Sequence, residues 1–351
     1  MTEKEILGYL SEVKHPAEGD RSIVELGLVD DIVVSQGKVK VVLSFGKRPD
    51  PLRNYLEGAA KAVLYRALPG GTDIEVETRV RKSAPAPKAP QFPLDEIEQV
   101  KHIVGIASGK GGVGKSTVAV NLAVALARLG YKVGLADADV YGPSVPLMTG
   151  TLDEVPEAVN EDGRDIFLPI EKFGVKWMSI GYFAPGSQAL VWRGPMACNA
   201  LKQMILQVRW GELDFLLIDM PPGTGDIHIS LVQDIPMEGA VIVTTPQEVA
   251  LADAEKGVDM FRNEKIDKRI FGIVENMSWF TPEDLPDRKY HIFGEGGGKR
   301  LADEAGVPLL GQIPLVGSLR EDADTGTPAA LGSRSDSLAF VALANALVSK
   351  I

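Results

Sequence analysis

The residue types best suited to phosphate chemistry stand together at positions 109–117, where glycines are interspersed with two lysines and two hydroxyl side chains. An apolar run at 103–107 precedes this segment, and apolar residues at helical spacing follow it. Glycines let backbone N–H groups turn inward without Cβ clashes, so the loop and the start of the next helix form a cradle for phosphate oxygens. Lys115 is expected to reach the β- and γ-phosphates, and the Ser116 hydroxyl to bind Mg²⁺. The predicted ATP-binding loop reads Gly109-Lys110-Gly111-Gly112-Val113-Gly114-Lys115-Ser116-Thr117.

Three carboxylates stand directly after apolar runs that read as buried strands. Asp137 and Asp139 follow the run at 132–136, and Asp219 follows the run at 216–218. Ligands of a doubly wound sheet bind outside the carboxyl ends of its strands, so these acids are expected beside the glycine loop. Asp219 would hold Mg²⁺ through water. The other two suit Mg²⁺ and the orientation of an attacking water, although one of them could instead only cap the following turn.

A glycine- and proline-rich segment, Met220-Pro221-Pro222-Gly223-Thr224-Gly225-Asp226, comes next in the chain. Gly223 is placed so that its N–H can sense a γ-phosphate, which makes the segment a candidate order–disorder switch. Phosphoryl transfer needs positioning and charge neutralisation more than covalent chemistry. Lys110, Lys115, Mg²⁺ and a held water therefore suffice for ATP hydrolysis.

The composition is that of a globular protein: 351 residues, 45% apolar and 24% charged, are enough for two domains. The net charge of −11 disfavours a nucleic-acid partner, because neutralising phosphates needs concentrated Lys and Arg. The charged start of the chain lacks the apolar core of a signal peptide, and no run of about 20 apolar residues could span a bilayer. We therefore expect a cytoplasmic protein without a membrane partner. The single cysteine, Cys198, severely limits any thiolate metal site.

The elements that must position these residues fall into two predicted domains. Residues 1–80 have the pattern of a small α+β domain, with a helix at 3–13, a hairpin at 32–34 and 39–45, a helix from 52 to 67 and a last strand at 74–78. The helix that begins at Leu52 carries Leu56, Ala59, Val63 and Ala67 on one predicted face. Residues 81–94 are rich in Pro and Ala, which is typical of an extended linker.

Residues 95–351 alternate short β-rich runs with helical segments, as a doubly wound, mostly parallel α/β sheet covered on both faces requires. The C-terminal run at 337–350 is interpreted as a closing helix packed on the core. A membrane-surface helix is the competing interpretation, which the scarcity of basic residues disfavours. The predicted strands are 103–107, 132–136, 215–218, 240–243, 270–274 and 309–312.

The second lysine of the loop, Lys110, resembles that of the MinD, Mrp and nitrogenase iron protein class of phosphate loops. This resemblance implies that Lys110 crosses to the nucleotide of a partner subunit, so that ATP lies between the chains of a homodimer. It also implies that Asp139 positions the attacking water and that Asp137 lies nearer the metal. Asn276 matches the position that reads the adenine edge in this class, with nearby Pro314 suited to pack on the base. A plain turn residue is the alternative for Asn276.

Nearly the whole of residues 95–351 resembles the Mrp/ApbC iron–sulfur carrier ATPases. The resemblance implies ATP binding and hydrolysis, and the transfer of a 4Fe–4S cluster to apoproteins. The motifs that carry it are GKGGVGKST, DADVYGPSVP, Trp192-Arg193-Gly194-Pro195-Met196, IDMPPGTGD, Glu275-Asn276-Met277-Ser278, Ile292-Phe293-Gly294-Glu295-Gly296-Gly297-Gly298 and Gly306-Val307-Pro308-Leu309-Leu310-Gly311.

The first 80 residues resemble a small domain of iron–sulfur assembly factors, through Ser22-Ile23-Val24-Glu25-Leu26-Gly27-Leu28-Val29 and Pro49-Asp50-Pro51-Leu52. Members often carry Asp-Pro where this chain has His15-Pro16, and Cys-Pro-Leu where it has Asp50-Pro51-Leu52. A reactive thiol is therefore absent from this domain. We expect His15 to be a solvated turn residue and Asp50 to be a helix N-cap.

Many Mrp/ApbC proteins carry a Cys-x-x-Cys pair between the positions of Ser278 and Ile292, and this chain has no cysteine there. A cluster normally needs four thiolates, and a homodimer of this chain offers two, so no iron–sulfur ligands are identified. Cys198 itself suits a small buried residue better than a ligand. Side chains Glu283, Asp284, Asp287 and His291 are either hard-metal ligands or, as we prefer, part of an exposed acidic loop.

Two functions are favoured over a MinD/ParA-type positioning ATPase, which would need a basic surface or membrane helix, and over an ATP-dependent ligase, for which no substrate residues are recognisable. The first is an ATP-bridged homodimeric ATPase that transfers iron–sulfur clusters to apoproteins. The second is a nucleotide-switched scaffold that recruits iron–sulfur assembly partners without holding a cluster, which the missing cysteines favour. Iron–sulfur clients or the assembly machinery are the expected partners in either case.

Overall fold

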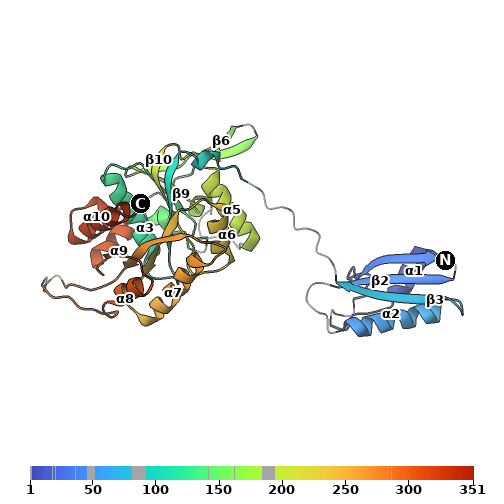
Figure 1. Ribbon diagram of the computed structural model, residues 1–351. Helices are drawn as coiled ribbons and strands as arrows, with labels where there is room; N and C mark the ends of the chain where they lie inside the picture. Colours follow the sequence, from blue (N-terminus) through green and yellow to red (C-terminus); the bar gives the residue numbers. More distant parts are fainter. Residues whose placement is uncertain are drawn as a thin grey trace. The chain divides into compact units, whose positions relative to one another are not determined.

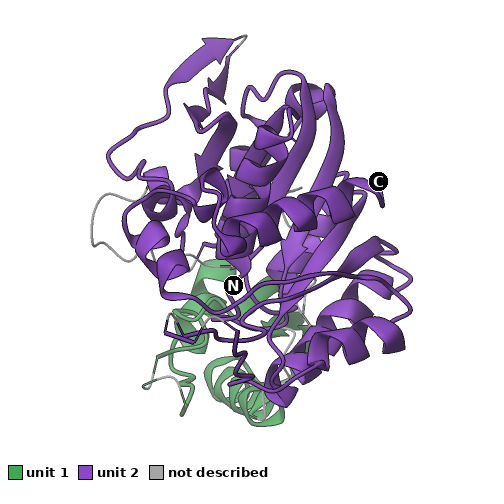
Figure 2. Cartoon of the chain, turned by 90° about the vertical axis from the view of Figure 1, so that its left-hand side faces the viewer, with its two compact units in different colours: residues 1–89 green, residues 90–351 purple. Residues whose placement is uncertain are grey.

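The computed structural model describes residues 2–17, 19, 21–35, 37–45, 52–80, 92–140, 142–161, 163–183, 194–282, 284–285 and 287–351. The chain forms two compact units, residues 1–89 and residues 90–351 (Figure 2). Most of the predicted linker at 81–94, and Asp50, lie outside the described residues.

The first unit is a three-stranded sheet with two helices. Strand β1 (Val29–Ser35) pairs antiparallel with β2 (Lys38–Phe45), which pairs parallel with β3 (Asp73–Val80). Helix α1 (Glu3–Leu10) begins at a capping box, in which the Thr2 side chain and the Glu5 side chain each accept a backbone N–H of the other residue. The strands and both helices predicted here are present.

Helix α2 (Arg53–Ala67) buries Leu56, Ala60 and Leu64 completely, whereas the predicted face had Ala59 and Val63 at its centre. Those two residues are only partly buried at the edge of the same core. The predicted and the observed buried residues both recur every three or four positions. The sequence pattern therefore did not determine which of two neighbouring faces of α2 is buried.

His15 corrects a prediction. It is only 4% exposed, whereas a solvated turn residue was expected. The backbone N–H of His15 donates to the Arg21 carbonyl oxygen at 2.9 Å, and Lys14 and Ser22 form an antiparallel bridge. Residues 14–15 and 21–22 therefore fold back on each other, a chain reversal that the sequence interpretation did not include.

The second unit is built on a large sheet with helices packed around it (Figure 1). The sheet has eight strands in the order β13-β12-β11-β4-β10-β5-β9-β8. All neighbours are parallel except the β8–β9 pair, which confirms a doubly wound, mostly parallel sheet. The strands are β4 (Val100–Ala107), β5 (Val133–Asp137), β8 (Ile170–Lys172), β9 (Val175–Ser179), β10 (Leu213–Asp219), β11 (Gly239–Thr244), β12 (Arg269–Glu275) and β13 (Leu309–Gln312).

The six strands predicted for this unit are all in the sheet. The sequence interpretation did not include β8 and β9, nor the separate antiparallel hairpin of β6 (Ala158–Glu161) and β7 (Arg164–Phe167). These four strands are three to five residues long, and β6 is exposed along its whole length. Such short strands carry little hydrophobic periodicity.

Helices cover both faces of the large sheet. Helices α3 (Lys115–Arg128) and α10 (Ser335–Val348) pack in one hydrophobic cluster. On the other face lie α5 (Gly194–Leu206), α6 (Asp226–Asp234), α7 (Glu248–Arg262) and α8 (Gly297–Glu304). Two shorter helices, α4 (Val145–Met148) and α9 (Gly317–Asp324), follow β5 and β13.

Helix α10 is a core helix, as preferred over the membrane-surface interpretation. Its residues Phe340, Leu343 and Leu347 are fully buried and belong to the cluster that contains α3. No helix in the described part of the chain is long and apolar enough to cross a membrane.

The register of the central strands brings the acidic residues to the phosphate loop. Strand β10 lies between β4 and β5, and Asp219 stands opposite Ile106 of β4 and Asp137 of β5. Because the three strands are parallel, the loop after β4 and the carboxylates at the ends of β5 and β10 share one edge of the sheet.

Gly109 is required by a close approach of two backbones. A Cβ atom at this position would collide with the carbonyl group of Asp253 in α7. Gly257, in the same helix, would place its Cβ in open space. The start of the phosphate loop is thus packed directly on α7.

We predict that Gly109→Ala lowers the free energy of unfolding by about 1–3 kcal/mol, because the α7 backbone must move to admit the methyl group. Gly257→Ala is the matched control and should leave stability unchanged or raise it by roughly 0.5–1 kcal/mol, as expected for an unhindered helical glycine. Urea unfolding of both variants measures the difference. Equal effects of the two substitutions would contradict the proposed packing constraint.

Candidate active site

The phosphate loop connects β4 to α3 and is shaped by two glycines with φ of +82°, Gly112 and Gly114. Gly114 is the N-cap of α3 and offers no side chain to the first N–H groups of that helix. Those groups and the helix dipole are therefore available to an anion. The loop lines a cavity of about 180 Å³, together with Asp139, Pro222 and residues of α4.

Lys115 is buried in this cavity wall, with 5% of its surface exposed. Its Nζ lies 2.6 Å from Asp219 Oδ1, 3.3 Å from Ser116 Oγ and 3.8 Å from Asp139 Oδ2. The structure thus brings three of the predicted site residues around the ammonium group of a fourth, Lys115.

Asp219 has one buried carboxylate oxygen, Oδ2, without a hydrogen-bond partner. Burial raises the pKa of Asp219, and the Lys115 ammonium opposes that shift. An unpaired buried carboxylate oxygen is costly, and a cation would satisfy it. The donor set of Asp219 and the neighbouring Ser116 hydroxyl is composed of the oxygen ligands that Mg²⁺ prefers, so these residues fit the predicted metal.

Asp137 is also fully buried, but both of its carboxylate oxygens accept hydrogen bonds. Oδ2 accepts from Ser179 Oγ at 2.9 Å and from the Val145 N–H at 3.3 Å, and Oδ1 accepts from the Asp139 N–H at 3.2 Å. These bonds tie the end of β5 to the start of α4. Burial, then the nearby Asp219 carboxylate, raise the pKa of Asp137 to about 7. The position of Asp137 beside a metal stays a prediction. Its hydrogen bonds to the backbone of Asp139 and Val145 shape the loop between β5 and α4.

Asp139 lines the phosphate cavity, as a water-positioning residue must. Its Oδ1 accepts from the Gly142 N–H at 3.2 Å, which holds the side chain at the turn after β5. Lys110 lines the same cavity and, within the described part of the chain, forms no ion pair.

Two of the hydrogen bonds that hold the predicted switch segment involve Gly223 and Pro221. The Gly223 N–H donates to the Ser108 carbonyl oxygen at 3.0 Å, so it must leave this partner before it can bind a phosphate. His228 Nε2 lies 2.5 Å from the Pro221 carbonyl oxygen, and burial lowers the pKa of this imidazole. The sequence interpretation missed Ser108 and His228, because neither belongs to a motif with a known phosphate contact.

A second cavity, of about 280 Å³, shares Gly114 and Thr117 with the phosphate cavity. It also contains Asn276 and Pro314, the two residues predicted at the base. Asn276 Nδ2 donates to the Val113 carbonyl oxygen at 2.9 Å, which ties the end of β12 to the phosphate loop. The sequence interpretation missed the residues of α9 that form the remaining wall.

The segment that replaces the cysteine pair forms a small closed loop. Phe280 and Tyr290 exchange backbone hydrogen bonds of 2.8 Å, and the Lys289 ammonium lies 4.0 Å from the centre of the Trp279 ring. The described residues contain no group of three or more His, Cys, Asp or Glu side chains placed to hold a metal ion; Glu283 lies outside them.

Cys198 is partly buried in α5 against the hydrophobic core. One such thiol per chain does not fit a four-thiolate cluster, even when two chains are combined.

Comparisons with known proteins relate both units of the chain to families named for iron–sulfur cluster assembly or iron transfer. A family model described as NUBPL iron-transfer P-loop NTPase matches residues 99–349, and one described as iron-sulfur cluster assembly protein matches residues 3–78. The iron-sulfur cluster carrier protein of Synechocystis sp. is 43% identical over 355 residues, which cover 100% of this chain and 98% of that protein. The protein of the same name from Escherichia coli K12 is 50% identical over 255 residues, 73% of this chain and 67% of that protein.

Solved structures show the same fold. A nucleotide-binding protein from Archaeoglobus fulgidus in complex with ADP matches with a TM-score of 0.57 and 36% identity, over 66% of this chain and 89% of that chain. The cell division ATPase MinD of Pyrococcus furiosus matches with a TM-score of 0.53 and 26% identity, over 71% of this chain and 99% of that chain. The phosphate loop, its carboxylates and these matches together show that the chain belongs to the NUBPL iron-transfer P-loop NTPase family, with an iron–sulfur cluster assembly domain at its N-terminus.

Proposed function

We propose that this P-loop ATPase is an iron–sulfur cluster carrier that binds and hydrolyses ATP as a nucleotide-bridged homodimer and delivers clusters to apoproteins. The observation that carries the nucleotide part is the junction of two cavities at Gly114 and Thr117. One cavity is lined by backbone N–H groups and lysines, and the other by Asn276 and Pro314. This arrangement suits a ligand with a triphosphate at one end and a base at the other.

The cavity residues have distinct roles in the proposed reaction. Lys115, held by Asp219 in the structure, would exchange this carboxylate for the β- and γ-phosphate oxygens. Ser116 and Asp219 would hold Mg²⁺, which supplies positive charge against the phosphates. Asp139 would orient the attacking water. Gly223 would leave Ser108 to donate its N–H to the γ-phosphate, which couples the nucleotide state to the switch segment.

Lys110 supports the dimeric part of the proposal. It lies at the phosphate cavity without an ion pair in the described residues, so its ammonium can reach a nucleotide held by a second chain. The Lys110 side chain is half-buried beside the phosphate loop, and ATP on the facing subunit would supply an anion for its ammonium.

The cluster is cargo in this proposal, and the names of the relatives support it. The scarcity of thiols favours a second candidate, a nucleotide-switched scaffold that recruits assembly partners and holds no cluster. The two differ in whether the purified chain can bind iron and sulfide.

Anaerobic reconstitution with iron and sulfide separates the two candidates. The carrier predicts cluster absorbance near one cluster per dimer and activation of an iron–sulfur apoprotein. ATP turnover by the same preparation serves as the control for folding. A chain that hydrolyses ATP but gains no cluster absorbance and activates no apoprotein would leave only the scaffold.

Substitutions of Lys115 and Lys110 should affect ATP binding and ATP hydrolysis differently. Lys115→Ala is expected to abolish ATP binding, because its ammonium contacts the phosphates directly. Lys110→Ala should keep binding within a few-fold and lose turnover by about 100-fold or more, the scale of one lost transition-state contact. Calorimetric titration and a phosphate-release assay measure the two effects, with Lys299→Ala on the exposed face of α8 as control. Parental turnover in Lys110→Ala would refute the cross-subunit role.

The pKa of Asp137 predicts how the stability of the nucleotide-free chain depends on pH. Its pKa is raised from an ordinary value of 3.8 to about 7, so folding favours the protonated form. The stabilisation is complete below pH 3.8 and is lost as the pH rises through 7. The free energy of unfolding should therefore be lower at pH 8 than at pH 5, by at most about 1.4 kcal/mol per pH unit for this group. Urea unfolding in a chelator measures it, and Asp137→Asn should reduce the slope; an unchanged slope would contradict the assignment.

A further inference from the structure

Helix α9 forms a large part of the second cavity without being fixed by the hydrophobic core. Leu319, Arg320, Ala323 and Asp324 of this helix line the cavity beside Gly114. None of the eight residues of α9 is fully buried, and only Leu319 packs at the edge of a core cluster. A helix of this length is not stable by itself, so other contacts must determine where this wall stands.

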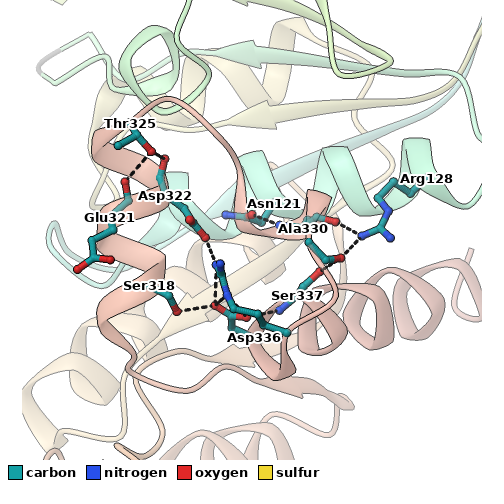
Figure 3. Close-up of polar contacts among 11 residues, drawn as sticks. Asn121, Arg128, Ser318, Glu321, Asp322, Thr325, Ala330, Asp336 and Ser337 are labelled. Carbon is teal, nitrogen blue, oxygen red and sulfur yellow. Dashed lines mark hydrogen bonds and ion pairs between the residues drawn. The ribbon is translucent and has the colours of Figure 1, made fainter. Parts of the chain in front are cut away.

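Polar contacts between α9 and the start of α10 supply that restraint, and we name Ser318, Asp322, Arg334 and Asp336 the clasp. Ser318 Oγ donates to Asp336 Oδ2 at 2.9 Å, and Arg334 Nε donates to Asp336 Oδ1 at 3.3 Å. The Arg334 guanidinium also pairs with Asp322. Figure 3 shows Ser318 and Asp322 extending from α9 toward Asp336.

Asp336 is the centre of the clasp and is 1% exposed. A buried carboxylate is stable only when it is paired and hydrogen-bonded, so Asp336 requires Arg334 and Ser318 to stay in place. It also accepts the Ser337 N–H at 2.8 Å, which fixes its side chain at the first turn of α10. Because α10 packs on the core, α9 is held to a rigid element.

The segment that leads into α10 is also bonded to α3, the helix that begins at the phosphate loop. Asn121 of α3 accepts the Ala330 N–H at 2.8 Å and donates to the Thr117 carbonyl oxygen at 2.9 Å. Arg128, also in α3, donates to the carbonyl oxygens of Ala330 and Gly332 (Figure 3). The segment before α10 is thus bound to α3, and the clasp places α9 relative to α3 and its phosphate loop.

We propose that Arg334 and Asp336 are positioning residues which hold α9 as the wall of the base and ribose part of the nucleotide site. The clasp then sets the affinity for the adenosine moiety of ATP, while the phosphate loop binds the triphosphate without its help. The inference rests on the proposed function, because it requires ATP to occupy both cavities. It adds to that function a group of residues that never touch the nucleotide.

The test compares two ligands in clasp variants. Asp322→Asn and Arg334→Gln each remove the Asp322–Arg334 pair. Asp322→Asn keeps the bond from Arg334 to the buried Asp336 carboxylate, whereas Arg334→Gln removes it as well. Asp303→Asn is the matched control, since it removes the exposed Lys299–Asp303 pair of α8. Dissociation constants are measured for ATP and for inorganic tripolyphosphate, both with Mg²⁺, together with KM and kcat for hydrolysis.

The clasp variants should bind ATP about three- to tenfold more weakly, the scale of one partly exposed ion pair. Their affinity for tripolyphosphate should match that of the parental chain, and KM should rise while kcat stays within about twofold. The double variant should resemble Arg334→Gln alone, because both substitutions remove the same pair. Hydrogen exchange of residues 317–324 should be faster in the nucleotide-free variants, and the control should match the parental chain throughout.

Two results would overturn the inference: unchanged ATP affinity in both clasp variants, or an equal loss of affinity for ATP and tripolyphosphate. The second would mean that the clasp supports the whole site rather than its base-binding wall. Failure of the proposed function is a separate result, since the parental chain would then bind tripolyphosphate no more weakly than ATP. Hydrogen exchange distinguishes the cases, because it reports on α9 without any nucleotide.

Discussion

The ammonium group of Lys115 lies near the carboxylates of Asp137, Asp139 and Asp219, and the strands of the second unit hold these charges together. Removing a charge from water costs several kcal/mol in a protein unless a close partner and hydrogen bonds compensate. Asp219 supplies the partner at 2.6 Å, but the carboxylates of Asp137 and Asp139 leave the site with more acid than base. The pKa of Asp137 is raised first by burial and then by the nearby Asp219 carboxylate, and one buried oxygen of Asp219 has no hydrogen-bond partner. A divalent cation would neutralise the excess negative charge of the site.

Parallel strands are what bring these charges together. Strands β4, β10 and β5 are neighbours in space, although more than 70 residues separate the ends of β5 and β10 in the chain. Their register places Asp219 opposite Asp137, and the loop after β4 meets both. The carboxyl ends of the strands therefore act as one surface on which residues from distant motifs converge.

The same surface holds the parts that can move. The Gly223 N–H is bound to Ser108 in the structure, and α9 is held by polar contacts rather than by buried apolar area. Elements with few buried contacts open at low free energy, which suits segments that must respond to a nucleotide. The hydrophobic clusters under α3, α7 and α10 keep the phosphate loop itself rigid. A rigid phosphate cradle between two adjustable walls is consistent with a nucleotide-dependent switch.

The sequence by itself determined the strand–loop–helix of the phosphate site, the positions of the six main strands along the chain and the scarcity of thiols. Each of these depends on local composition or on a count, such as the glycines at 109–114 or the single Cys198. The prediction failed at His15, and at the rotation of α2, because burial depends on how the rest of the folded chain packs around a residue. It could not identify α9 as a cavity wall, nor the clasp that holds it. Only the tertiary structure decided those features, because hydrogen bonds between residues such as Ser318 and Asp336 depend on the path of the chain between helices and leave no periodic signal.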